Sequence, residues 1–207
     1  MELLSDKLAR HMAPEALQTL FQGSGRSSIR FVRKQVAVLY AQPVALAACP
    51  PRLRESFVAK VKWLVGRHLG RLDIYMRKGA TVFFEDPQDC LRMAIELQGS
   101  APGFPLRIGV HSGIADVATF ETEGRTRHTL LGPVATEAAE VAGTAAIGSI
   151  VVSTACYTLV QETLRDVTGD CLLMEEFMST DLAQACITPA PSAGHGQSTF
   201  AGLGLTA

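Results

Sequence analysis

The stretch RLDIYMRKGATVFFEDPQDCLRMAIELQ, residues 71–98, decides the fold of this chain. Two short runs, 72–77 and 80–85, are rich in apolar and β-branched residues and flank Gly79. Strand-forming runs on either side of a glycine are typical of two antiparallel strands joined by a tight turn. The stretch therefore predicts a β-hairpin in the middle of the chain.

Two helices are predicted on either side of this hairpin. An acid–proline turn precedes residues 90–98, where Asp86 or Asp89 is expected to cap the helix. Apolar residues recur at helical spacing over 52–69, at Leu53, Phe57, Val61, Leu64, Val65 and His68. Six basic residues against one acid lie within 52–71. This excess indicates either a phosphate-binding face or a solvated helix surface, and His68 is expected to lie at its boundary.

The rest of the chain alternates strands and helices. Before the hairpin we predict two short helices within 3–22 separated at Pro14, a flexible connector over 23–28 and a strand over 31–41. After it we predict strands over 106–120 and 126–132, a helix over 134–146, and a short strand from 149 followed by a helix capped by Ser153. A pair of strands up to about 187 and a flexible tail from 189 complete the predicted elements. Gly113 is expected to mark a bulge or a bend in its strand.

This order of elements predicts the fold class. Strand, helix, hairpin, helix and strand form a βαββαβ unit, which indicates an α+β protein with a ferredoxin-like core. We expect one mostly antiparallel sheet with helices on one face. The predicted organisation is a helical lead-in and connector over 1–30, one domain over 31–188 and a flexible tail over 189–207.

Charge is unevenly distributed although the formal net charge is only −1. Residues 1–120 carry 16 Lys and Arg against 10 Asp and Glu, whereas residues 121–207 carry 3 against 10. The near-zero total argues against nucleic-acid binding. The imbalance, +6 against −7, is either chance or the sign of a self-complementary surface for pairing of two copies.

The remaining composition excludes several classes of protein. No apolar run reaches the length of a membrane span, and the N-terminal segment lacks the features of a signal peptide. The five cysteines are Cys49, Cys90, Cys156, Cys171 and Cys186, and no CxxC or HExxH spacing occurs. We therefore expect reduced thiols, no metal site built from His and Cys, and a cytoplasmic location. Ser112 beside His111 is expected to be structural, because no base, acid or oxyanion loop accompanies it.

Several segments, taken together, resemble the class III nucleotidyl cyclase homology domain. LARHMAPEALQTLFQG (8–23) resembles a lead-in found ahead of these domains, and QVAVLYAQP (35–43) resembles their first strand. The hairpin stretch is similar to the family pattern GR-x-x-K-x-x-GDG-x-MA-x-F-x-DP. LRIGVHSG (106–113) is similar to LRIGIHTG, and the LLG turn and IVVS strand follow in the family order.

The resemblance also implies that the family's chemistry is missing here. The family uses two carboxylates to hold two metal ions against the triphosphate. The resemblance places Gln42 and Lys78 at these two positions, and neither is a good Mg²⁺ ligand. The positions that read the base are Ile74 and Pro133, the ribose position is Thr136, and the position of the transition-state arginine is Glu140.

The resemblance therefore implies a catalytically inactive, cyclase-like domain that is not an enzyme. We expect a dimerising regulatory or protein-interaction module in bacterial-type signalling, with a homodimer, an unknown protein partner, and no metal or other cofactor. One alternative is a nucleotide- or anion-binding sensor, in which Lys78, Arg77 and Arg71 form an anion pocket. In the other, the chain is the activating, non-catalytic subunit of a cyclase heterodimer.

Overall fold

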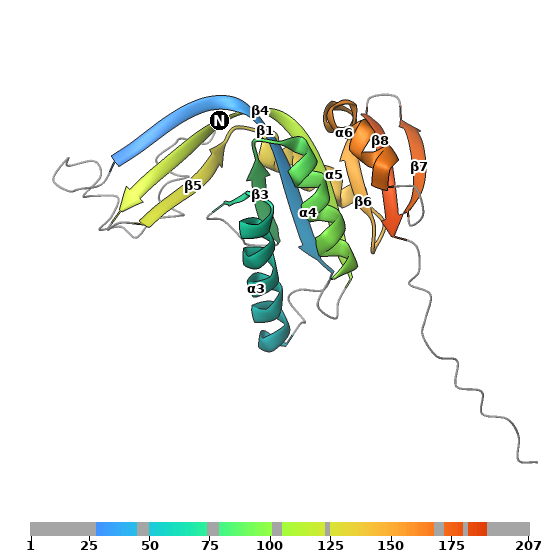
Figure 1. The fold of residues 1–207 in the computed structure, drawn as a ribbon, viewed down its shortest axis with the longest axis horizontal. Helices are drawn as coiled ribbons and strands as arrows, with labels where there is room; N and C mark the ends of the chain where they lie inside the picture. Colours follow the sequence, from blue (N-terminus) through green and yellow to red (C-terminus); the bar gives the residue numbers. More distant parts are fainter. Residues whose placement is uncertain are drawn as a thin grey trace, which may run out of the picture.

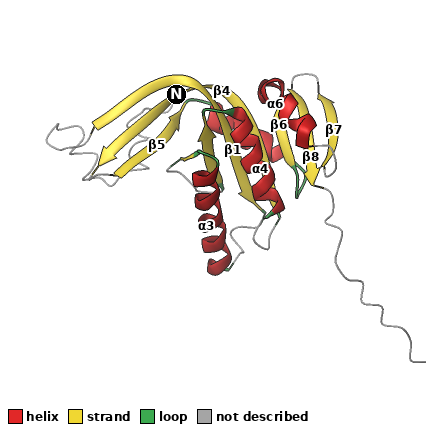
Figure 2. Ribbon diagram, in the orientation of Figure 1, coloured by secondary structure: helices red, strands yellow, loops and turns green. Residues whose placement is uncertain are grey.

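All described strands of the chain join one mixed sheet (Figures 1 and 2). The structure is a computed structural model, and it describes residues 28–44, 50–73, 79–100, 105–122, 125–167, 172–179 and 182–189. The strands are β1 (Ser28–Pro43), β2 (Arg71–Leu72), β3 (Ala80–Phe84), β4 (Leu106–Thr122), β5 (Arg125–Leu131), β6 (Ile150–Ser153), β7 (Leu172–Ser179) and β8 (Leu182–Pro189). Their order is β2-β3-β1-β4-β6-β8-β7, with β5 paired to β4.

The predicted fold class is confirmed by this topology. The four strands β2, β3, β1 and β4 are antiparallel neighbours and form the ferredoxin-like centre of the sheet. Among the described strand pairs, only β4 and β6 run parallel. The expected pair of late strands is also present, as β7 and β8. The predicted helices within 3–22 lie outside the described residues, as does the predicted tail over 189–207 apart from Pro189, which ends β8.

Helices cover both faces of the sheet, which corrects the expectation of one covered face. The described helices are α3 (Pro51–Arg67), α4 (Pro87–Gly99), α5 (Val134–Thr144) and α6 (Thr154–Val167). Ala37, Leu39 and Ala41 of β1 pack in the main core cluster with α3, α4 and α6. Val36 and Val38 point the other way and pack with Val134 and Ala138 of α5. Because successive strand residues alternate between faces, β1 lies between two cores.

The length of β1 and β4 was underestimated from sequence. The two strands pair without interruption from Ser28 opposite Glu121 to Pro43 opposite Leu106, so β1 begins three residues before the expected start. Gly113 lies opposite Val36 within this continuous register, so of the two expected features, a bulge or a bend, the bulge is excluded. The strands bend instead, as the long curve of β1 in Figure 1 shows.

Helix α4 illustrates how local sequence sets a boundary. It begins at Pro87, three residues before the expected start, because proline is well suited to the first helical position. Asp86 is the N-cap, and its side chain accepts a hydrogen bond from the Gln88 backbone N–H at 2.8 Å. Of the two predicted caps, the structure thus selects Asp86. Among the described residues, no helix is long and apolar enough to cross a membrane.

Candidate functional site

The end of β1 places Gln42 on the α5 face of the sheet. Val36 and Val38 face α5, and the alternation of strand side chains puts Tyr40 and Gln42 on the same side. Gln42 is partly buried, and its cross-strand neighbour is Arg107 on β4. Directly opposite residues in an antiparallel pair have Cβ atoms about 5 Å apart, so these two side chains are neighbours.

Arg107 carries an unsatisfied polar atom at this position. Its Nε is buried without a hydrogen-bond partner, and no described carboxylate lies within ion-pair distance of its guanidinium. Within the described part of the chain, the pair at the end of β1 is therefore a neutral amide beside a guanidinium that has no carboxylate partner. Mg²⁺ favours charged oxygen ligands, so this pair is better suited to water or an anion than to a metal ion.

The hairpin that precedes β3 approaches β1 closely at Gly79. A Cβ atom on Gly79 would lie 2.4 Å from the carbonyl oxygen of Ala41, so only glycine fits against the end of β1. This contact places the Gly79 backbone next to the strand end that carries Gln42. Ile74, Arg77 and Lys78 precede this glycine in the chain and lie outside the described residues.

Helix α5 presents the other three positions singled out by the family resemblance. Pro133 is its N-cap, and Thr136 and Glu140 follow along the helix. All three are exposed. The helix packs closely on β4 at Gly109. A Cβ atom on Gly109 would lie 2.4 Å from backbone atoms of α5, so a side chain there would not fit.

Three linked side chains on the same face, His111, Glu137 and Ser153, were not predicted from sequence. His111 Nδ1 lies 2.8 Å from Ser153 Oγ, and His111 Nε2 lies 3.1 Å from Glu137 Oε2. The imidazole thus links β4, the end of β6 and α5. Ser153 is fully buried, which argues against a nucleophilic role and favours a structural one. Ser153 and Glu137 lie 42 and 26 residues after His111 in the sequence, so no local pattern could have predicted these contacts.

Ser112 does not contact these three side chains, in keeping with the structural role expected for it. Its hydroxyl donates to the Val36 carbonyl oxygen at 3.1 Å and accepts from Gln35 Nε2 at 3.0 Å. Adjacent residues on a strand face opposite sides, so Ser112 and His111 do not act together.

Of the three residues expected to form an anion pocket, Lys78, Arg77 and Arg71, the structure describes only Arg71. Arg71 pairs with Phe83, four residues along β3 from Gly79, which is a separation of roughly 13 Å. Its guanidinium instead lies 3.3 Å from Glu85, which also contacts Lys34 at 2.6 Å. The Lys34 hydrogen bond, together with the charges of Lys34 and Arg71, lowers the pKa of Glu85.

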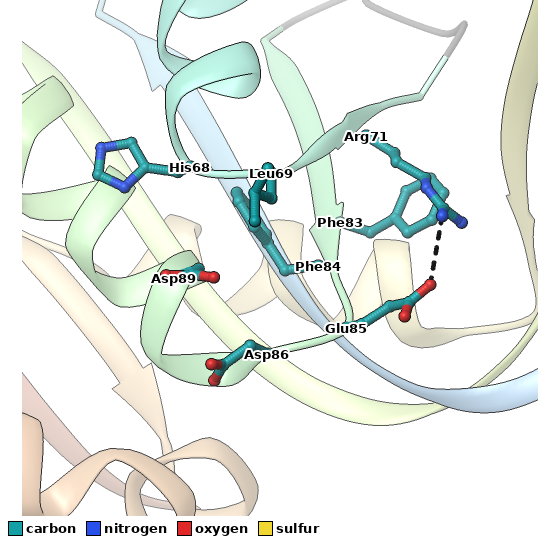
Figure 3. Close-up of a pocket in the computed structure, with 8 residues that line it drawn as sticks. All are labelled: His68, Leu69, Arg71, Phe83, Phe84, Glu85, Asp86 and Asp89. Carbon is teal, nitrogen blue, oxygen red and sulfur yellow. Dashed lines mark ion pairs between the residues drawn. The ribbon is translucent and has the colours of Figure 1, made fainter.

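A small pocket occupies this opposite end of β3 (Figure 3). It has a volume of about 270 Å³ and is lined by His68, Leu69, Arg71, Phe83, Phe84, Glu85, Asp86 and Asp89. Its carboxylates are already engaged: Glu85 pairs with Arg71, Asp89 with Arg92, and Asp86 caps α4. Of the positions singled out by the family resemblance, the four that the structure describes, Gln42, Pro133, Thr136 and Glu140, do not line the pocket. Within the described residues, no three His, Cys, Asp or Glu side chains gather in a way that could hold a metal ion.

Comparison with known proteins identifies the fold. No protein-family model and no curated protein sequence matches the chain. Solved structures do match, among them adenylate cyclases from Trypanosoma brucei in their monomeric state, with TM-score 0.62 and 15% identity over 76% of this chain and 91% of that one. The adenylyl cyclase CyaB from P. aeruginosa matches with TM-score 0.58 and 14% identity, over 79% and 98% of the two chains.

A third match is the dimeric guanylyl cyclase domain of the RhoGC fusion protein from the aquatic fungus Blastocladiella emersonii. Its TM-score is 0.58 with 11% identity, and the match covers 77% of this chain and 97% of that one. These likenesses show that the chain has the fold of the class III cyclase homology domain. They extend over almost the whole length of the cyclase domains.

Proposed function

We propose that this chain is a catalytically inactive cyclase-like domain that acts as a dimerising regulatory or protein-interaction module. The observation that carries the proposal is the pair at the end of β1, where the amide of Gln42 stands beside the unpaired guanidinium of Arg107. The family resemblance assigns to Gln42 the role of first metal carboxylate. A neutral ligand next to a positive charge gives Mg²⁺ little to bind.

The α5 positions support the same proposal. The resemblance assigns the transition-state arginine to the position of Glu140, which is exposed on α5. A carboxylate there would repel the negative charge that develops on a transferring phosphate, where catalysis requires a positive group. Thr136 and Pro133 likewise replace the ribose- and base-reading residues. The metal-ligand position on β1 and the base, ribose and transition-state positions on α5 therefore all carry residues unsuited to the family's chemistry.

Dimerisation is part of the proposal and rests on the fold and on charge. A structural neighbour is described as dimeric and another as monomeric, so proteins of this fold occur in both states. In this chain, residues 1–120 carry an excess of six positive charges and residues 121–207 an excess of seven negative charges. Such asymmetry favours association of two copies. Light scattering at micromolar concentration should give twice the mass of one chain, and a mass of one chain would refute this part.

The inactivity is tested with a metal-binding variant and an activity assay. The wild-type protein should form no cyclic nucleotide from ATP or GTP with Mg²⁺ or Mn²⁺, and should show no heat of Mn²⁺ binding. The double variant Gln42→Asp/Lys78→Asp restores both implied carboxylates and should bind Mn²⁺ while remaining inactive, because the α5 residues are still absent.

Gln35→Asp provides the matched control, since Gln35 lies on the same strand and faces the other side of the sheet. This variant should gain no Mn²⁺ binding. Cyclic nucleotide formation by the wild-type protein would overturn the proposal.

A further inference from the structure

Helix α3 has a buried inner side and a cationic outer side. Phe57, Val61 and Leu64 are buried in the main core cluster. The basic residues Arg52, Arg54, Lys60, Lys62 and Arg67 lie on the remaining surface of the helix. Glu55 is the single acid among them. The 17 residues of α3 span roughly 25 Å, so the charges form a long cationic ridge.

Most of these cations have no counter-charge on the described surface. Arg67 Nε lies 3.4 Å from Glu96, but no described carboxylate forms an ion pair with Arg52, Arg54, Lys60 or Lys62. The first turn of α3 contains no acid. Basic side chains near a helix N-terminus are disfavoured by the helix dipole, so Arg52 and Arg54 do not serve the stability of the helix itself.

Trp63 stands within this ridge with an exposed fraction of 53%. Lys60 Nζ lies 4.6 Å from the centre of its ring, and Arg67 Cζ lies 5.3 Å from it. An indole bordered by cations presents an apolar body with a charged rim. This combination is typical of side chains that sit at a membrane–water interface.

We propose that the outer side of α3, the Trp63 face, docks on the surface of an anionic lipid bilayer. The Trp63 face is defined by Arg52, Lys60, Trp63 and Arg67, which the 3.6-residue repeat of the helix places on one side of α3, whereas Arg54 and Lys62 lie on another flank. In this arrangement the basic residues contact lipid phosphates and carboxylates, and the indole enters the headgroup region. Figure 1 shows α3 at the edge of the molecule, where a flat surface can reach it.

The surroundings of Trp63 favour a bilayer over a soluble nucleic acid. Stacking of nucleic-acid bases needs an open ring face, whereas Lys60 and Arg67 lie over the Trp63 ring.

The test uses the fact that Trp63 is the only tryptophan of the chain. Full-length protein is titrated with vesicles of phosphatidylcholine containing about one-third phosphatidylserine, and in parallel with pure phosphatidylcholine. We expect a blue shift of tryptophan emission and co-sedimentation with the anionic vesicles alone, both reversed in about 1 M salt. Equal binding to both vesicle types, or to neither, would overturn the proposal.

Matched variants locate the surface. Arg52→Gln/Lys60→Gln should lower the partition coefficient about tenfold or more, because each basic residue contributes about 1 kcal/mol near an anionic surface. Arg30→Gln/Arg33→Gln changes net charge equally on β1 and should bind like the wild type, since both residues are exposed away from α3. Equal loss in the two double variants would refute the role of the Trp63 face. Circular dichroism confirms that each variant is folded.

Titration with soluble anions distinguishes a lipid surface from a soluble anionic partner. Pyrophosphate and double-stranded DNA, titrated under the same conditions, should leave the emission of Trp63 unshifted. A shift with either of these, without one on anionic vesicles, would assign the surface to a soluble partner and overturn the bilayer proposal. None of these readouts depends on cyclase chemistry, so failure here is distinct from failure of the proposed function.

Discussion

His68 Nε2 lies 2.9 Å from Glu96 Oε2, and this contact fastens the end of α3 to α4. Arg67 Nε lies 3.4 Å from the same carboxylate oxygen, so the last residue of α3 and the C-cap His68 share one partner. The hydrogen bond from His68, with smaller contributions from the charges of Arg67 and Lys60, lowers the pKa of Glu96. The contact holds the Trp63 face in a fixed orientation on the sheet.

Acidification should release this contact. A carboxylate whose pKa is lowered on folding contributes stability above its ordinary pKa of 4.5, and this contribution is lost as the pH falls through the folded pKa. We expect Glu96→Gln to be less stable than the wild type at pH 6, with the difference narrowing towards zero by about pH 3. Urea unfolding at each pH measures it. A difference that is constant over this range would contradict the assigned ionic role.

The packing of α5 on β4 gives a second prediction, with a control on the same helix. In Gly109→Ala the new Cβ would lie 2.4 Å from the Ala138 carbonyl oxygen and the Ala142 nitrogen, which are backbone atoms and cannot move aside cheaply. We expect a loss of about 2–3 kcal/mol in the free energy of unfolding. Gly143→Ala on α5 meets nothing within 4 Å and should gain about 0.5–1 kcal/mol from helix propensity. Similar effects of the two changes in urea unfolding would show that α5 does not approach β4 as described.

The order of elements could be predicted from sequence because it depends on local patterns. The paired strands on either side of the hairpin, the α3 periodicity and the Asp86 cap each depend on a few neighbouring residues, and all three are found, although residues 74–78 of the hairpin lie outside the described part of the chain. The early start of β1 at Ser28 was missed, because a polar, Arg-rich segment becomes a strand there only by pairing with the distant end of β4.

Less of the candidate site than of the fold could be predicted from the sequence. The resemblance singled out Gln42, but it did not predict the neighbouring guanidinium. Arg107 lies 65 residues away in the sequence, and strand register brings it opposite Gln42. The same is true of the His111 contacts with Glu137 and Ser153. Strand register likewise places Arg71 beside Phe83, where its guanidinium contacts Glu85, whereas Lys78 lies outside the described residues.

The two buried cysteines provide a third prediction. Cys90 and Cys156 are both fully buried in the main core cluster. Burial raises the pKa of Cys156 to about 12, and it raises the pKa of Cys90 well above the usual value. The thiolate is the reactive form, so neither residue should react with iodoacetamide at pH 8 in the native protein. Peptide mass spectrometry after labelling, with and without denaturant, checks this. Labelling of Cys156 in native buffer as fast as in denaturant would contradict the burial.

The last prediction concerns Gln42 and Arg107. A carboxylate at position 42 would lie opposite the unpaired guanidinium, so Gln42→Glu should stabilise the protein by about 0.2–1 kcal/mol, the range for a cross-strand pair of opposite charge. Urea unfolding at low salt measures the gain, which should shrink in high salt because of screening. The same change in an Arg107→Gln background serves as the control and should give no gain. If the gain persisted without Arg107, the added charge would be acting through another group, and the two side chains would not be the neighbours that the β1–β4 register makes them.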